Sequence, residues 1–193
     1  MATIGPLDAM FLMMEAREKP AHVGGLQLFE PPEGAPPDFL GQLYEEAVQD
    51  PGEMRSLFLK RPYRPGGLGP WSWRPDEKFD VEYHVRHSAL PEPGRIRELL
   101  ALVSRLHGSL LDRNRPLWEA HLIEGVADGR FALYSKVHHA LVDGVSAMRL
   151  MVVMLRLISS ATALCCSAAV AIWVFISLMV PTSSAITPRL CAA

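Results

Sequence analysis

The sequence has few cysteines and no cluster of positive charge. Its three cysteines are Cys165, Cys166 and Cys191, so nothing before Cys165 can form a disulfide. That pattern is consistent with a reducing cytosol. The 19 lysines and arginines are balanced by 21 acidic residues, and no basic run is present of the kind that marks a nucleic-acid surface. We therefore expect no nucleic-acid partner.

Acidic residues and histidines are absent from the last part of the chain. All 21 acidic residues and all seven histidines lie at or before Asp143, and residues 157–180 carry no formal charge. About 20 such residues can span a bilayer as a helix. Two origins explain this tail: a membrane anchor, or an apolar end produced by a shift of the reading frame. We therefore divide the chain into a globular part, residues 1–153, and an apolar tail, residues 154–193, with a candidate transmembrane helix over 157–180.

The globular part alternates helical and strand patterns, which predicts an α/β fold. Apolar residues recur every three or four positions over residues 38–48 and 95–111, and a short apolar helix is expected over 7–14. Strands are expected over residues 22–29, 81–87, 117–124 and 131–137, the last two forming an antiparallel hairpin. On a strand, His84 and His87 would lie on opposite faces, so this pair predicts no metal site. The N-terminus lacks a basic stretch followed by an apolar run, so no secretory signal is expected.

The residues that suggest chemistry follow the last of these strands. His138 and His139 are adjacent, and Asp143 and Gly144 come four and five positions after the second histidine. Alternation along the strand predicts that His139 is the histidine carried toward the interior. An imidazole with an ordinary pKa of about 6.5 can accept a proton from an alcohol, thiol or amine. Asp143 could orient the site or simply cap a helix that begins at position 145, and the histidines could be core residues.

Three segments together resemble a known family. His138 to Gly144 match the HHxxxDG signature of the CoA-dependent acyltransferase superfamily, which includes chloramphenicol acetyltransferases and the condensation domains of peptide synthetases. Residues 6–12 (Pro-Leu-Asp-Ala-Met-Phe-Leu) and 115–119 (Arg-Pro-Leu-Trp-Glu) narrow the resemblance to the bacterial wax ester synthase/diacylglycerol acyltransferase family. The similarity runs from about Pro6 to about Met151. Members of that family are more than twice as long, so the resemblance covers an N-terminal subdomain.

The resemblance implies a fold, an activity and a site. The fold is α/β and chloramphenicol acetyltransferase-like, with the catalytic histidine in a tunnel between two similar subdomains. The activity is transfer of a fatty acyl group from acyl-CoA, a co-substrate, to diacylglycerol or a long-chain alcohol, with no cofactor or metal. His139 is the implied general base and His138, Asp143 and Gly144 shape the site. The implied substrate pocket is formed by Pro116, Leu117 and Trp118.

The implied setting is cytoplasmic and associated with a membrane or lipid-droplet surface. Because the second subdomain is missing from the resemblance, we expect the 193-residue chain alone to have little or no activity, unless a homo-oligomer completes the tunnel. Two alternatives stay open: another HHxxxDG acyltransferase or condensation enzyme, and an inactive, truncated, membrane-associated remnant.

Overall fold

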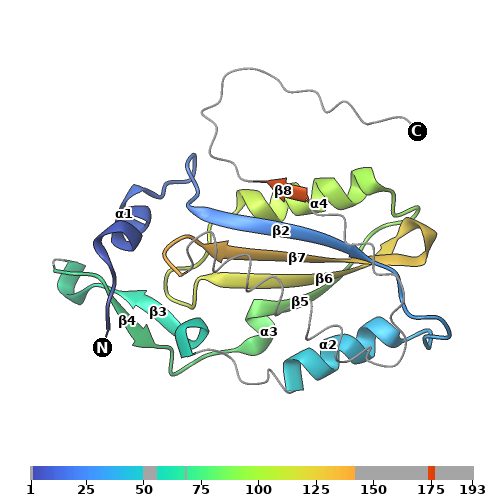
Figure 1. Ribbon diagram of the computed structural model, residues 1–193, viewed down its shortest axis with the longest axis horizontal. Helices are drawn as coiled ribbons and strands as arrows, with labels where there is room; N and C mark the ends of the chain where they lie inside the picture. Colours follow the sequence, from blue (N-terminus) through green and yellow to red (C-terminus); the bar gives the residue numbers. More distant parts are fainter. Residues whose placement is uncertain (1, 50–55, 68, 142–173, 177–193) are drawn as a thin grey trace.

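A five-stranded sheet forms the centre of the computed structural model, which describes residues 2–49, 56–67, 69–141 and 174–176 (Figure 1). Its strand order is β5-β6-β7-β2-β8. The strands are β2 (His22–Phe29), β5 (Val85–Ala89), β6 (Trp118–Val126), β7 (Arg130–His138) and β8 (Val174–Ile176). β5 runs parallel to β6, whereas the other neighbours are antiparallel.

The expected hairpin is confirmed. β6 and β7 pair from Trp118 opposite Val137 to Val126 opposite Arg130. The connection is the short turn η3 (Ala127–Gly129), in which Asp128 has φ 65° and Gly129 has φ 69°. These left-handed conformations are accessible to glycine and, at low cost, to aspartate. The strand predicted over residues 22–29 is also confirmed and pairs with β7 along its whole length.

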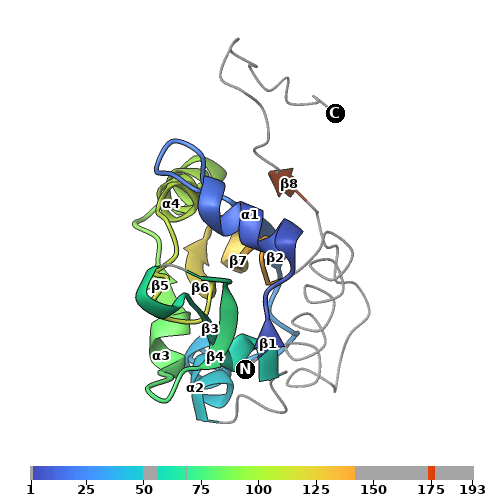
Figure 2. The ribbon, with the colours of Figure 1, turned by 90° about the vertical axis from the view of Figure 1, so that its left-hand side faces the viewer.

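The three predicted helices are present as α1 (Pro6–Met14), α2 (Phe39–Gln49) and α4 (Ile96–Gly108). A second sheet of order β1-β4-β3 is built from β1 (Ala2–Thr3), β4 (Ser72–Pro75) and β3 (Lys60–Tyr63). Short 3-10 turns, η1 (Ser56–Leu59) and η2 (Pro65–Gly67), flank β3. Figure 1 shows α1 and the small sheet at the end of the molecule where β7 finishes, and Figure 2, viewed from that end, shows α1 in front of β2 and β7.

Both faces of the central sheet are covered. Leu99 and Val103 of α4 pack with Ile123, Ala132 and Tyr134 on one face. On the other face, Leu43 of α2 packs on Leu122 and Phe131 at one end of the strands, and the small sheet and α1 pack at the other end. The members of this last cluster include Leu12, Phe58, Trp73, Trp118 and Val137. The sheet is therefore an inner layer, and the side chains on both of its faces are buried.

Two predictions about the elements are wrong in part. Residues 81–84 form a short helix, α3 (Val81–His84), because the Asp80 side chain accepts a hydrogen bond from the Glu82 backbone N–H at 3.1 Å and caps it. Only β5 remains of the expected strand. Within the apolar tail, Val174–Ile176 pair with β2 as a strand, so this part of the predicted helix is not helical. The rest of the tail lies outside the described residues, within which no helix is long and apolar enough to cross a membrane.

Candidate active site

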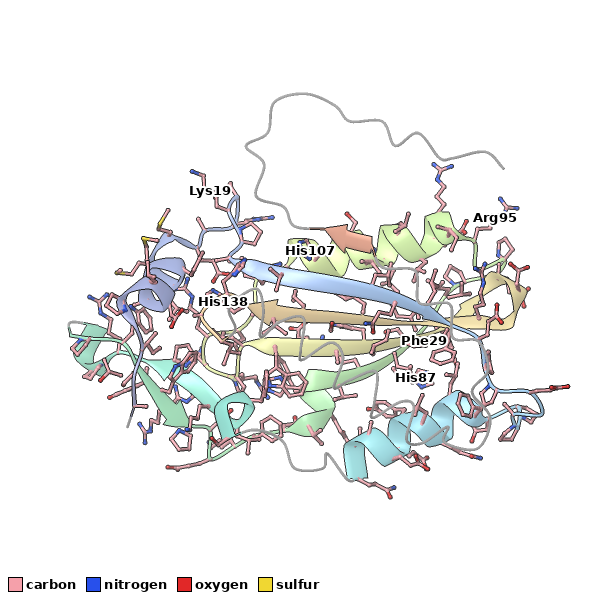
Figure 3. The ribbon with its side chains drawn as sticks, viewed as in Figure 1. Lys19, Phe29, His87, Arg95, His107 and His138 are labelled. Carbon is pink, nitrogen blue, oxygen red and sulfur yellow. The ribbon has the colours of Figure 1, made fainter. Side chains whose placement is uncertain are left out.

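The two histidines lie where β7 ends, between β6 and β2. The backbone N–H of His138 donates to the carbonyl of Leu117 at 3.0 Å, and that of His139 donates to the carbonyl of Ala21 at 2.9 Å. The carbonyl of His138 then accepts a hydrogen bond from the N–H of Leu141, which turns the chain. The neighbouring strands thus hold the backbone of both residues. Figure 3 shows His138 at this end of the sheet.

The relative burial of the two histidines differs from the prediction. His138 is completely buried, whereas His139 is only partly buried. The prediction that His139 is the one directed into the interior is therefore wrong. It assumed that one face of the strand meets the core and the other meets solvent, but both faces of β7 are covered. His139 is instead the more exposed of the two.

The imidazole of His139 is covered on one side by an aromatic ring. The ring of Phe11, from α1, stacks on it with a centroid separation of 4.8 Å and an interplanar angle of 17°. Burial is the main cause that lowers the pKa of His139 below its ordinary value of 6.5, and the neighbouring His138 acts in the same direction. A neutral imidazole is therefore the dominant form near pH 7. Within the described ranges neither of its ring nitrogens has a hydrogen-bond partner, so the one nitrogen that is unprotonated in the neutral ring has no internal donor competing for its lone pair.

One nitrogen of the His138 imidazole forms a hydrogen bond, and the other faces a carboxylate. Its Nδ1 accepts a hydrogen bond from the backbone N–H of Ala140 at 2.9 Å, so Nδ1 is unprotonated and Nε2 carries the proton. Nε2 lies 3.4 Å from Oε1 of Glu15, a close polar contact but too poorly aligned for a hydrogen bond. Glu15 also pairs with Arg113 at 3.0 Å. His138 is therefore committed to internal contacts and is poorly placed to exchange protons with a substrate.

Comparison with known proteins identifies the family. Residues 4–166 match the family model described as the wax ester synthase/diacylglycerol acyltransferase catalytic domain, which is well over half of the chain. The chain belongs to this family. Among curated proteins, the chain is 58% identical over 146 residues to a probable diacylglycerol O-acyltransferase of Mycobacterium tuberculosis. It is 47% identical over 150 residues to the O-acyltransferase WSD of Acinetobacter baylyi.

Solved structures agree with this membership. The wax ester synthase/diacylglycerol acyltransferase from Marinobacter aquaeolei superposes with a TM-score of 0.72 at 53% identity, covering 79% of this chain and 38% of that one. The starter condensation domain of the rhizomide synthetase superposes with a TM-score of 0.62 at 13% identity, a likeness of fold alone. The predicted fold class, α/β and acyltransferase-like, is thereby confirmed. The chain spans about a third of the length of the curated relatives it matches.

Three residues predicted to shape the substrate pocket of this acyltransferase-family chain lie directly beside the histidines. Pro116, Leu117 and Trp118 are all buried, and the carbonyl of Leu117 is the one that accepts the His138 N–H. Trp118 donates its Nε1–H to the carbonyl of Phe58 at 2.9 Å and stacks on His84 at 4.6 Å. Their packing role is evident, and their substrate role stays a prediction. Asp143 and Gly144 lie outside the described residues.

Sequence reasoning missed Glu15 and Arg113. Glu15 follows an apolar helix, and Arg113 lies 98 positions later in a loop before β6. Nothing in their local sequence distinguishes them from other exposed charges. The one available signal was the position of Glu15, three residues after the family-like segment, residues 6–12. Their proximity to His138 depends on how α1 packs across the end of the sheet.

Proposed function

We propose that this chain is the N-terminal catalytic subdomain of an O-acyltransferase that moves a fatty acyl group from acyl-CoA to diacylglycerol or a long-chain alcohol. The observation that carries the proposal is His139: a partly buried imidazole with a lowered pKa, set under an apolar helix, whose ring nitrogens have no hydrogen-bond partner among the described residues. The family membership supports the reaction class. The alternative condensation chemistry is disfavoured because the condensation-domain likeness is one of fold alone.

The proposed reaction needs one proton acceptor that later returns the proton. Neutral His139 removes the proton from the acceptor hydroxyl while that oxygen attacks the thioester carbonyl. A new C–O ester bond forms, the C–S bond breaks, and the imidazolium returns its proton to the CoA thiolate. General-base assistance of this kind contributes about 10²–10⁴ in rate. The thioester is already an activated acyl donor, so the proposal requires no metal or other cofactor.

The surroundings of His139 suit a lipid substrate. The helix α1 places Phe11 against the imidazole and also exposes four apolar side chains, namely Leu7, Met10, Met13 and Met14. Flexible thioethers adapt to irregular apolar ligands such as acyl chains. We accordingly propose that α1 contacts the lipid substrate or the lipid surface that holds it, that Pro116, Leu117 and Trp118 wall the pocket, and that Asp143 and Gly144 complete the site. A cytoplasmic location at a membrane or lipid-droplet surface fits such a substrate.

The test measures CoA release from palmitoyl-CoA with hexadecanol or dioleoylglycerol as acceptor. The 193-residue chain, which spans about a third of its relatives, is expected to release little CoA unless a homo-oligomer completes the tunnel. A chimera is the active reference, in which residues 1–153 replace the matching part of the Mycobacterium tuberculosis relative. In it, His139→Ala should lower the rate by at least about 10²-fold.

The matched control is His138→Ala, which alters the adjacent imidazole but should reduce the rate less. Both variants are first checked for native folding by circular dichroism. Near-normal turnover by a folded His139→Ala protein would refute the assignment. A wild-type chimera without activity would favour the alternative that residues 1–153 derive from an inactive remnant.

A further inference from the structure

Glu15 has no part in the proposed proton transfer, yet it contacts three segments that meet at the two histidines. Its Oε1 accepts a hydrogen bond from the backbone N–H of Ala21 at 3.2 Å, just before β2. Its Oε2 accepts two hydrogen bonds from Arg113, at 3.0 and 3.3 Å, from the loop before β6. Oε1 also lies 3.4 Å from Nε2 of His138 at the end of β7. The carboxylate therefore joins parts of the chain that are distant in sequence.

The contact with His138 selects one form of its ring. Because Nδ1 accepts from Ala140, the proton of the neutral imidazole must lie on Nε2, which faces the carboxylate. The two groups are too poorly aligned for a hydrogen bond, but a carboxylate 3.4 Å away attracts the partial positive charge of an N–H and would repel an unprotonated nitrogen lone pair. Glu15 and Ala140 thus favour the same tautomer from opposite sides of the ring.

His139 is connected to Glu15 by two separate routes. Along the backbone, the His139 N–H donates to the carbonyl of Ala21, whose own N–H donates to the Glu15 carboxylate. Through α1, the Glu15 N–H donates at 3.1 Å to the carbonyl of Phe11, the residue whose ring stacks on His139. Movement of Glu15 would therefore disturb both the backbone and the ring position of His139.

The carboxylate is charged although its side chain is only 1% exposed. Burial by itself raises the pKa of Glu15, but the neighbouring His138, the Ala21 amide and Arg113 outweigh it and lower the pKa to about 2. A buried charge is retained only where its partners offset the lost hydration. Replacement by a neutral group of the same shape would leave the guanidinium and the imidazole without that partner.

We propose that Glu15 is a positioning residue for the proposed active site: its carboxylate favours the Nε2–H tautomer of His138, and its bonds to Ala21, through the carboxylate, and to Phe11, through the backbone N–H, fix His139. The catalytic consequence rests on the proposed function. The positioning itself does not, because it can be measured in the 193-residue chain without turnover.

The decisive measurement is nuclear magnetic resonance of the 193-residue chain with ¹⁵N-labelled histidine at pH 7. The wild-type chain should show His138 with a protonated Nε2, and a His139 Cε1 proton shifted upfield by the Phe11 ring. Glu15→Gln keeps the shape of the side chain but removes its charge, and should weaken both signatures. The matched control is Glu18→Gln, an exposed residue three positions later, which should change neither.

Two results would overturn the proposal: a wild-type His138 protonated on Nδ1, or a folded Glu15→Gln chain with both histidine signatures unchanged. If Glu15→Gln does not fold, the wild-type tautomer and Arg113→Gln decide instead. Arg113 is 38% exposed and its loss removes one support of Glu15, so the shift of His139 should move in the same direction by a smaller amount.

The same variants separate this inference from the proposed function. In the acyl-transfer assay of the chimera, Glu15→Gln should lower kcat by up to about 10²-fold, which is the cost of misplacing a reacting group by about 1 Å. The KM for palmitoyl-CoA should change little. Glu15→Asp should recover part of the loss. If the wild-type chimera transfers no acyl group, the proposed function fails, while the resonance data on the 193-residue chain still decide the role of Glu15.

Discussion

The two faces of the central sheet are both buried, but they are built from different chemistry. The face under α4 carries a row of polar and ionisable side chains. They are Glu119 and His121 of β6, Tyr134, Lys136 and His138 of β7, and His22 of β2. The opposite face is mainly apolar, with Gln27 and Ser135 as polar exceptions. Its members include Trp118, Ala120, Leu122, Phe131 and Val137.

The polar face is held together by specific pairings. Lys136 is fully buried, and its Nζ donates to the carbonyls of Leu106 and Ser109, at 2.9 and 3.0 Å, where α4 ends. The same Nζ lies 3.4 Å from Glu119. These contacts satisfy carbonyls that a helix leaves unpaired at its C-terminus. His107 of α4, labelled in Figure 3, forms a 2.8 Å hydrogen bond with Tyr134.

The apolar face is held by packing. Trp118 contacts Phe58 and Phe79 edge-on or tilted, and its single polar atom is satisfied by the Phe58 carbonyl. Packing tolerates changes of pH and of charge, whereas paired buried charges do not. The stability of the fold therefore depends, through the polar face, on each member of these buried pairs and on pH. The polar face also ends at His138 and Glu15, which links this dependence to the site.

The largest effect is expected from removing the central charge of the polar face. Lys136→Met should lower the free energy of unfolding by about 3–5 kcal/mol, because Glu119 and the last carbonyls of α4 lose their partner while remaining buried. Urea denaturation of the 193-residue chain at pH 7 measures this. Lys19→Met, at an exposed lysine, is the control, and adding Glu119→Gln to Lys136→Met should restore part of the loss. A cost below about 1 kcal/mol would show that the polar face does not depend on this buried charge.

Acid should act next most strongly, again through the polar face. Burial lowers the pKa of His22 from 6.5 to about 4, although its bond to the His107 carbonyl opposes this. Between these two values the unfolded chain binds the proton more readily than the folded chain. Neutral His22 therefore makes its full contribution to the free energy of unfolding above pH 6.5. That contribution falls on acidification and is smaller by about 3 kcal/mol at pH 4. Urea midpoints at pH 7, 5.5 and 4.5 test this, and His22→Gln should flatten the dependence. An unchanged slope in that variant would exclude His22 as its source.

The smallest effect is expected on the apolar face. Trp118→Phe keeps an aromatic ring but leaves the Phe58 carbonyl without its donor, and should cost about 1–3 kcal/mol. Because no titrating group is removed, the cost should be equal at pH 7 and pH 5.5, which urea denaturation at both values checks. A marked pH dependence of this cost would show that the two faces are not energetically separate.

The regular elements were largely predictable from local pattern. Alternating side chains and a short polar connection predicted the β6–β7 hairpin. Apolar residues three and four positions apart predicted α2 and α4. The pattern failed at residues 81–84, where the Asp80 cap forms α3 in place of a strand. A cap depends on one side-chain rotamer, and residues that suit a strand can also form one helical turn.

The site was predictable in composition but not in arrangement. The adjacent histidines and the family resemblance identified His138 and His139, and the family is confirmed. Which of the two is completely buried could not be predicted, because alternation says which residues share a face but not whether both faces are covered. The role proposed for His139 stays a prediction.

The sequence alone was enough to predict the pairing of β6 with β7, the two alternating faces of β7 and the family. Tertiary structure alone decided that Glu15 and Arg113, 98 positions apart, meet at His138, and that Phe11 stacks on His139. The physical reason is the sequence distance over which each kind of interaction acts. Periodicity and turn conformations are set by neighbours within a few residues, whereas a buried ion pair forms only after separate elements pack and exclude water from both charges.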